Sequence, residues 1–232
     1  MTDIQEAVLF GPSYSAYVRA ARIALEEKGV AYRLEPVDIF GGAAEDPAYL
    51  ARHPFGRVPA FEHAGFRLYE TGAITRYLDE AFDGPPLQPA DARDRARMNQ
   101  AIAVIDGYGY WPWVRVIFVQ RVEGPRRGGT DEAAIAAALP DAARALDALD
   151  AIKGEQPWLA GPSFSLADVQ AAPMIDYLTQ AAEGRALLGE RLRLAAWWER
   201  LAERRSVVAT RYLVNQMTAE QKRQAERGSD PI

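Results

Sequence analysis

The chain has 232 residues, enough for one or two compact domains with a sizeable core. Its formal charge is −5, from 27 lysines and arginines against 32 aspartates and glutamates, so neither nucleic acid nor an anionic membrane is an expected partner. It has no cysteine, which excludes disulfides and thiolate chemistry from its own side chains, and its two histidines lack metal-site spacing, so no metal is predicted.

The chain begins MTDIQEAVLF, with acidic residues where a signal peptide has a basic region. Its apolar runs are far shorter than the roughly 20 residues that span a bilayer. A cytoplasmic protein is therefore expected.

Residues 6–82 alternate short apolar segments with helical patterns. The first apolar segment closes at Gly11-Pro12, and the spacing of Val18, Ala21 and Leu25 then predicts a helix that stops at Lys28-Gly29. The predicted order is β-α-β-α-β-β-α, with strands at 7–10, 31–37, 58–62 and 66–69, a short helix at 45–51, a hairpin turn at Ala64-Gly65 and a last helix over 74–82.

Segment 83–89 carries three prolines in seven residues and is expected to be a domain linker. Beyond it the apolar residues repeat with helical spacing, which predicts a helical bundle. We expect helices to bend or restart at Pro112, Pro140 and Pro173, and a polar tail from about Asn215. The predicted division is a first domain at 1–82, a linker at 83–90 and an all-helical domain at 91–232.

The segment GPSYSAYVRAARIALEEKG, residues 11–29, places hydroxyl side chains at the start of the first helix. Unpaired N–H groups and the helix dipole favour an anion there, and a thiolate would suit the site. The alternative is that Ser13 or Ser15 only caps the helix, a role that serine often fills.

The segment RHPFGRVPAF, residues 52–61, has Val58-Pro59 at the entrance of a strand. A cis bond there would leave the N–H and C=O of Val58 facing outward, free to pair with an extended peptide. An ordinary trans proline in a loop is the alternative.

The segment YETGAITRYLDEAF, residues 69–82, places Glu70-Thr71 at the start of a helix. The N–H groups and the hydroxyl can bind a carboxylate, and the Glu70 carboxylate can take an ammonium group, so an amino-acid head fits the site. The alternative is that Thr71 caps the helix and Glu70 is a solvated charge.

Together these three segments resemble the cytosolic glutathione transferase family, in its phi- and theta-like, bacterial, serine-type form. RHPFGRVPAF…YETGAITRYL is close to the phi-like pattern R-N-P-F-G-Q-V-P…F-E-S-x-A-I-T-x-Y-L. GPSFSLADVQAAP, residues 161–173, resembles the family's buried capping box, in which Ser165 caps a helix and Asp168 closes the box. The resemblance implies an α+β protein: a thioredoxin-like βαβαββα domain followed by an all-α domain.

By position, the resemblance assigns to Ser15 the hydrogen bond that stabilises the glutathione thiolate, with Ser13 as the fallback. It implies that Val58, next to Pro59, pairs with the cysteinyl backbone. Glu70 and Thr71 would hold the γ-glutamyl head.

The glycine end of the implied glutathione site departs from the family. Ala44 and Glu45 stand where phi-like proteins have a His-Lys pair. Arg57 stands where glutamine is common in the family. It could supply the missing cation, because a guanidinium group can form two parallel hydrogen bonds with a carboxylate.

The pocket for the second substrate is expected between the first loop and the segment DGYGYWPWVRVIF, residues 106–118. Half of its aromatic residues are assigned to core packing instead. Some relatives use a tyrosine in place of the catalytic serine, so Tyr14 and Tyr17 remain alternatives for that role. The predicted pocket residues are Tyr14, Tyr17, Tyr110, Trp111, Trp113 and Arg115.

The resemblance implies a detoxifying transferase that uses glutathione as co-substrate, acts on small hydrophobic electrophiles, and pairs two subunits into a homodimer. Disulfide exchange is excluded, because it needs a cysteine. The alternatives are a non-catalytic binding or interaction protein on the same scaffold, or a glutathione-dependent peroxidase, isomerase or ether-cleaving enzyme.

Overall fold

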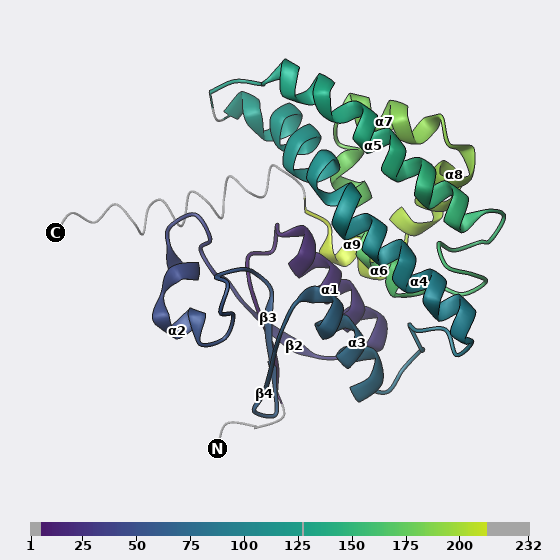
Figure 1. Cartoon of the computed structure of the whole chain (residues 1–232). Helices are drawn as coiled ribbons and strands as arrows, with labels where there is room; N and C mark the ends of the chain where they lie inside the picture. The colour runs from purple at the N-terminus through teal and green to yellow at the C-terminus, as the bar shows by residue number, and fades with distance from the viewer. Residues whose placement is uncertain (1–5, 127, 213–232) are drawn as a thin grey trace.

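The computed structural model of the chain describes residues 6–126 and 128–212 (Figure 1). The predicted order of elements in the first domain is confirmed, with one additional 3-10 turn. The elements are β1 Ala7–Phe10, α1 Ala16–Lys28, β2 Tyr32–Glu35, η1 Ala43–Glu45, α2 Pro47–Leu50, β3 Ala60–His63, β4 Phe66–Tyr69 and α3 Thr71–Ala81.

The four strands form one mixed sheet in the order β2-β1-β3-β4. β1 runs parallel to β2 and antiparallel to β3, and β3 and β4 form the predicted hairpin. Its turn residues Ala64 and Gly65 have φ of 50° and 80°, as a two-residue hairpin turn requires. α1 and α3 pack on the face of the sheet toward the helical domain, and α2 lies on the opposite side (Figure 1).

α1 is the central helix of the molecule, because it packs against α3 and also against α6 of the second domain. It begins at the cap Ser15 and ends at Gly29, whose φ of 66° is the left-handed conformation of a helix C-cap. Small side chains such as Ala20, Ala21 and Ala24 are fully buried and let the neighbouring elements approach closely.

Within the described residues, every element after the first domain is helical. They are α4 Ala92–Val104, η2 Ile105–Gly109, η3 Trp111–Glu123, η4 Gly124–Arg126, α5 Glu132–Lys153, α6 Leu166–Leu178, α7 Ala182–Gly189, α8 Leu192–Ala202 and α9 Arg205–Thr210. The prediction of an all-helical second domain is confirmed. The polar segment from Asn215 lies outside the described residues.

The helices do not restart at two of the three prolines where a bend or a restart was expected. α5 runs through Pro140 and α6 runs through Pro173 without interruption. A proline removes one intrahelical hydrogen bond, and packing of the apolar helix face offsets that loss. Only Pro112 coincides with irregular geometry, at the start of the π-helical stretch η3.

The predicted capping box of α6 is confirmed. Ser165 accepts from the amide of Ala167 at 3.3 Å, and Asp168 accepts from the Ser165 amide at 2.9 Å. Asp168 is fully buried and also accepts from the indole of Trp197, on α8, at 2.8 Å. The box therefore joins α6 to α8.

Residues 82–91 connect the two domains and are fixed to both of them. Lys28 and Asp79 form a buried ion pair at 3.2 Å, and Asp79 accepts from the amide of Leu87 at 2.7 Å. The Leu87 carbonyl in turn accepts from Leu166 at the start of α6. None of the helices described is both long and apolar enough for a membrane span.

Candidate active site

Ser15 lies at the N-terminus of α1, half-buried. Its Oγ accepts a hydrogen bond from the amide of Val18 at 3.4 Å, which is long for such a bond. Because the oxygen is the acceptor here, its own proton stays available to a ligand. Ser15 therefore combines the two roles that the sequence left as alternatives, helix cap and potential donor. Ser13, two residues earlier, is half-buried and does not cap the helix.

Gly11 brings the first loop against Val58. It has φ of 145°, and a Cβ on it would lie 2.5 Å from Val18 Cγ2 and 3.1 Å from Val58 Cβ. The Val58-Pro59 bond is cis, the isomer on which the peptide-docking hypothesis depends. β3 begins at Ala60, so Val58 precedes the strand ladder.

A hydrogen bond from α2 fixes the backbone beside Val58. The Tyr49 hydroxyl donates to the carbonyl of Arg57 at 2.7 Å, and burial raises the pKa of Tyr49 to about 12. The phenol therefore stays protonated and keeps its role as donor.

Glu70 stands at the N-cap of α3 in an unusual backbone conformation, with φ of 71°. A non-glycine residue at positive φ is costly, and such strain concentrates at functional sites. The Glu70 side chain makes no capping bond. Thr71 is the first residue of α3 and is buried, so it is not the cap. The Glu70 carboxylate is therefore open to a ligand, whereas the first-turn amide of Ala73 already donates to the Glu70 carbonyl at 3.0 Å.

A cavity of about 390 Å³ is lined by Phe55, Arg57 and Glu70. The buried His53 ring packs against Tyr69 with centroids 5.0 Å apart. Burial lowers the pKa of His53, which favours its neutral form. The sequence predicts that His53 and His63 are structural or exposed, and the burial of His53 agrees with a structural role.

Arg57 lies next to the segment where the sequence departs from the family pattern. Gly56 has φ of 59°, and a Cβ on it would lie 2.9 Å from the carbonyl oxygen of Ala44. This close approach sets the exposed Arg57 beside η1, which contains Ala44 and Glu45. A positive side chain is therefore present at that end of the cavity.

Comparison with known proteins agrees with this geometry. A family model described as the glutathione S-transferase N-terminal domain matches residues 9–86, and one described as the C-terminal domain matches residues 132–200. Glutathione S-transferase F14 of Arabidopsis thaliana is 34% identical over 208 residues, which cover 85% of this chain and 82% of that protein. The chain belongs to the glutathione S-transferase family.

Solved structures of glutathione transferases resemble this glutathione S-transferase in fold over most of its length. Glutathione transferase F2 from Populus trichocarpa is 29% identical with a TM-score of 0.79, covering 88% of this chain and 96% of that one. A theta-class enzyme from the citrus canker pathogen Xanthomonas axonopodis pv. citri, solved with glutathione bound, is 30% identical with a TM-score of 0.77, covering 88% and 95%.

Tyr17, Asp106 and Gln170 form a polar cluster between the domains of this glutathione S-transferase. The Tyr17 hydroxyl donates to Asp106, and Gln170 Nε2 donates to the same carboxylate at 2.6 Å. Burial raises the pKa of Asp106 and that of Tyr17, whereas the charge of Arg57 lowers the pKa of Tyr17.

Sequence reasoning missed Asp106 and Gln170. Asp106 stands four residues before Tyr110, so the two share a helical face, and this spacing was the available signal. The ring of Tyr110 packs on Tyr17 with centroids 4.8 Å apart, and the exposed Arg115 hydrogen-bonds to the Tyr110 hydroxyl. Gln170 carried no sequence signal.

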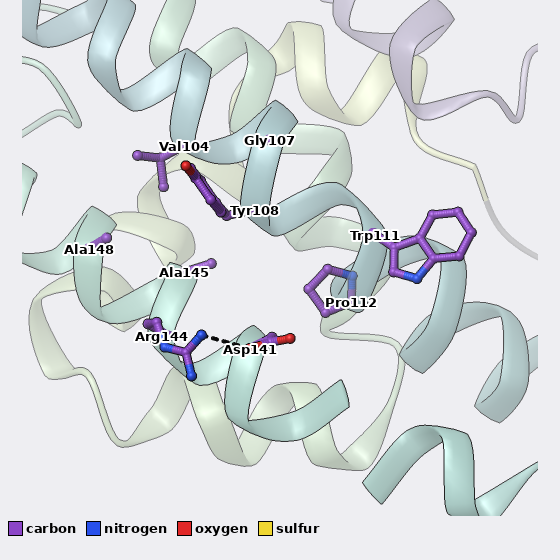
Figure 2. Close-up of a pocket in the computed structure, with 9 residues that line it drawn as sticks. All are labelled: Val104, Gly107, Tyr108, Trp111, Pro112, Asp141, Arg144, Ala145 and Ala148. Atoms are coloured by element: carbon purple, nitrogen blue, oxygen red, sulfur yellow. Dashed lines mark hydrogen bonds and ion pairs between the residues drawn. The ribbon is translucent and has the colours of Figure 1, made fainter. Parts of the chain in front are cut away.

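Two predicted pocket residues are corrected by the structure. Trp113 is fully buried and its indole donates to the carbonyl of Ala142 at 3.1 Å, so it belongs to the core. Trp111 is 65% exposed, and no contact of its ring with the first loop is seen among the described residues. It lines a different cavity, of about 440 Å³, shown in Figure 2 with Val104, Gly107, Tyr108, Pro112, Asp141, Arg144, Ala145 and Ala148.

Tyr14 is half-buried in the first loop and stacks on Phe40, with ring centroids 6.2 Å apart. Its ring also packs near Tyr212, at 5.8 Å. Tyr14 therefore contacts aromatic residues of both domains.

Proposed function

We propose that this glutathione S-transferase joins the glutathione thiolate to small apolar electrophiles and that Ser15 stabilises the thiolate. The observation that carries the proposal is the Ser15 hydroxyl at the N-terminus of α1, with its proton uncommitted. A donor aimed at sulfur, together with the helix dipole, favours thiolate over thiol. The thiol proton passes to solvent, a carbon–sulfur bond forms, and the leaving group departs with the electron pair of its own bond.

The cavity lined by Phe55, Arg57 and Glu70, together with the backbone around Val58, would supply contacts for the rest of the tripeptide. The Val58 amide and carbonyl would pair with the cysteinyl residue, since they precede the ladder of β3. Glu70 would bind the γ-glutamyl ammonium group, and the Thr71 end of α3 its carboxylate. Arg57 would bind the glycine carboxylate in place of the usual basic pair.

The electrophile would bind beside the sulfur, between the first loop and η2. Tyr14, Tyr17 and Tyr110 supply aromatic surface, and Arg115 supplies a cation for a departing anion.

A detoxifying role and a cytoplasmic location follow from the family resemblance and belong to this proposal. So does the domain division at 1–82, 83–90 and 91–232, which agrees with the interval between α3 and α4.

The proposal includes pairing of two subunits, the first domain of one against the helical domain of the other. Phe55 and Phe66 are 69% and 49% exposed on the first domain, and Tyr108 and Trp111 are 71% and 65% exposed beside the cavity along α5 (Figure 2). Exposed aromatic groups beside a cavity are typical of a protein interface.

Replacement of Ser15 by alanine tests the mechanism. A hydrogen bond to a charged group contributes about 1.5–3 kcal/mol, so S15A is expected to lower turnover of a chloronitroaromatic substrate roughly 10- to 100-fold while glutathione still binds. Calorimetry measures the binding. S163A, at an exposed serine of the helical domain, is the matched control. Unchanged turnover in S15A would move the role to Ser13 or a tyrosine.

A further inference from the structure

A hydrogen bond from the helical domain holds the first loop. The hydroxyl of Tyr177, on α6, donates to the carbonyl of Tyr14 at 2.5 Å, across 163 positions of sequence. The amide of Ser15 donates to the carbonyl of Pro12 at 3.0 Å. The Tyr14 carbonyl and the Ser15 amide belong to the same peptide group, so both of its polar ends are fixed, one from within the loop and one from the other domain.

Tyr177 is itself held rigidly. It is 2% exposed, its ring lies under the guanidinium of Arg19 at 4.9 Å, and it packs on Phe118 with centroids 4.4 Å apart. Burial raises its pKa, so the phenol keeps the proton that it donates.

A buried ionic cluster fixes the surroundings of Tyr177. Arg19, on α1, is fully buried and pairs with Asp176 on α6 at 2.8 Å. It also donates to the carbonyl of Thr210 at 3.0 Å. Breaking such a pair is strongly destabilising, because it leaves an uncompensated buried charge. α1, α6 and the end of α9 therefore keep one mutual position.

We propose that Tyr177 is a positioning residue for Ser15, through which the helical domain sets the direction of the serine hydroxyl toward the glutathione sulfur. This inference rests on the proposed role of Ser15. The serine Oγ is separated from the backbone by a single rotatable bond, so the orientation of the Tyr14–Ser15 peptide determines which directions the hydroxyl can reach. A hydrogen bond to a thiolate weakens steeply when it is misaligned.

The test is Y177F, which removes one oxygen and keeps the ring against Arg19 and Phe118. We expect kcat to fall roughly 3- to 30-fold, with the KM for glutathione within about twofold of wild type. Ultraviolet thiolate absorbance of the glutathione complex, followed against pH, is expected to shift to higher pH, because the thiolate is less stabilised. A merely structural role would not move this titration.

The matched control is Y77F, which also removes a phenol oxygen, here one bonded to His63 Nδ1 at 2.8 Å in the first domain. It is expected to lower the melting temperature and to leave the thiol titration unchanged. A Y177F protein with a lowered melting temperature and a wild-type titration would overturn the proposal.

The double variant S15A/Y177F separates this inference from the proposed function. If Tyr177 acts through Ser15, its replacement causes little further loss in the S15A background, whereas independent effects multiply. If S15A alone leaves the titration unchanged, the proposed role of Ser15 fails first. If S15A shifts the titration and Y177F does not, only the positioning role is wrong.

Discussion

At the scale of single residues, the site depends on backbone conformations that few side chains tolerate. Glycine is required at position 11 because a Cβ there would clash with Val18 and Val58. It is required at position 56 because a Cβ would clash with the Ala44 carbonyl. Glu70 adopts positive φ without being a glycine. The glycines let the loops of the first domain converge, and the strain at Glu70 is retained where an amino-acid head is proposed to bind.

Arg57 is predicted to recognise the glycine carboxylate. An exposed charge pair contributes about 1 kcal/mol, so R57A is expected to raise the Kd for glutathione roughly three- to tenfold in calorimetry. Wild type should bind the glycine ethyl ester of glutathione more weakly than glutathione itself, and R57A should lose this discrimination. R67A, at another exposed arginine of the same domain, is the control. An R57A protein that still prefers the free carboxylate would contradict the assignment.

At the scale of elements, α6 links the first loop to the core of the helical domain. Its N-terminus is fixed by Ser165 and Asp168, and its C-terminal half presents Asp176 and Tyr177 to α1 and the first loop. Every residue of α6 is buried, so its position is determined by packing on all sides. Changes at its cap are therefore expected to affect global stability.

D168N tests the cap of α6. Asparagine cannot accept with both side-chain atoms, so buried donors from Ser165, Leu159 or Trp197 would lose partners. We expect a loss of about 3 kcal/mol in the free energy of unfolding, measured with denaturant. D131N, at the exposed cap of α5, should stay within about 0.5 kcal/mol, since asparagine caps a helix as well as aspartate. Equal effects at the two caps would contradict this account.

At the scale of the whole molecule, the two domains share one main core. The principal cluster of buried apolar residues runs from the sheet through α1 into the helical domain, and the Arg19–Asp176 ion pair crosses the same interface. The domains are therefore expected to unfold together. The exposed aromatic groups lie outside this core, at the surfaces proposed for the second subunit.

Y108A/W111A tests the pairing. Removing both rings from the rim of the cavity along α5 is expected to convert the dimer into monomer at micromolar concentration, because interface energy concentrates in a few aromatic residues. Light scattering coupled to size exclusion measures the mass. L192A removes a 78% exposed leucine on α8 and should leave the mass unchanged. A wild-type protein of monomer mass would contradict the pairing.

The sequence by itself determined the order of elements in the first domain, the helical nature of the second, the capping box and the family. These follow from local spacing, turn residues and short motifs, which act between residues that are close in the chain. It also brought forward Ser15, Val58 and Glu70, whose surroundings in the structure agree with the proposed roles.

Only the tertiary structure decided which aromatic residue of segment 106–118 packs against α1. Trp113 and Trp111 follow the same local pattern as Tyr110 but have different neighbours. The tertiary structure alone also shows that Asp106 bonds to Gln170 and that Tyr177 bonds to Tyr14. Helical periodicity predicts the side of a helix on which a residue lies. It does not identify the distant segment that packs against that side. Those partners are chosen by packing and by the need of buried polar groups for hydrogen bonds.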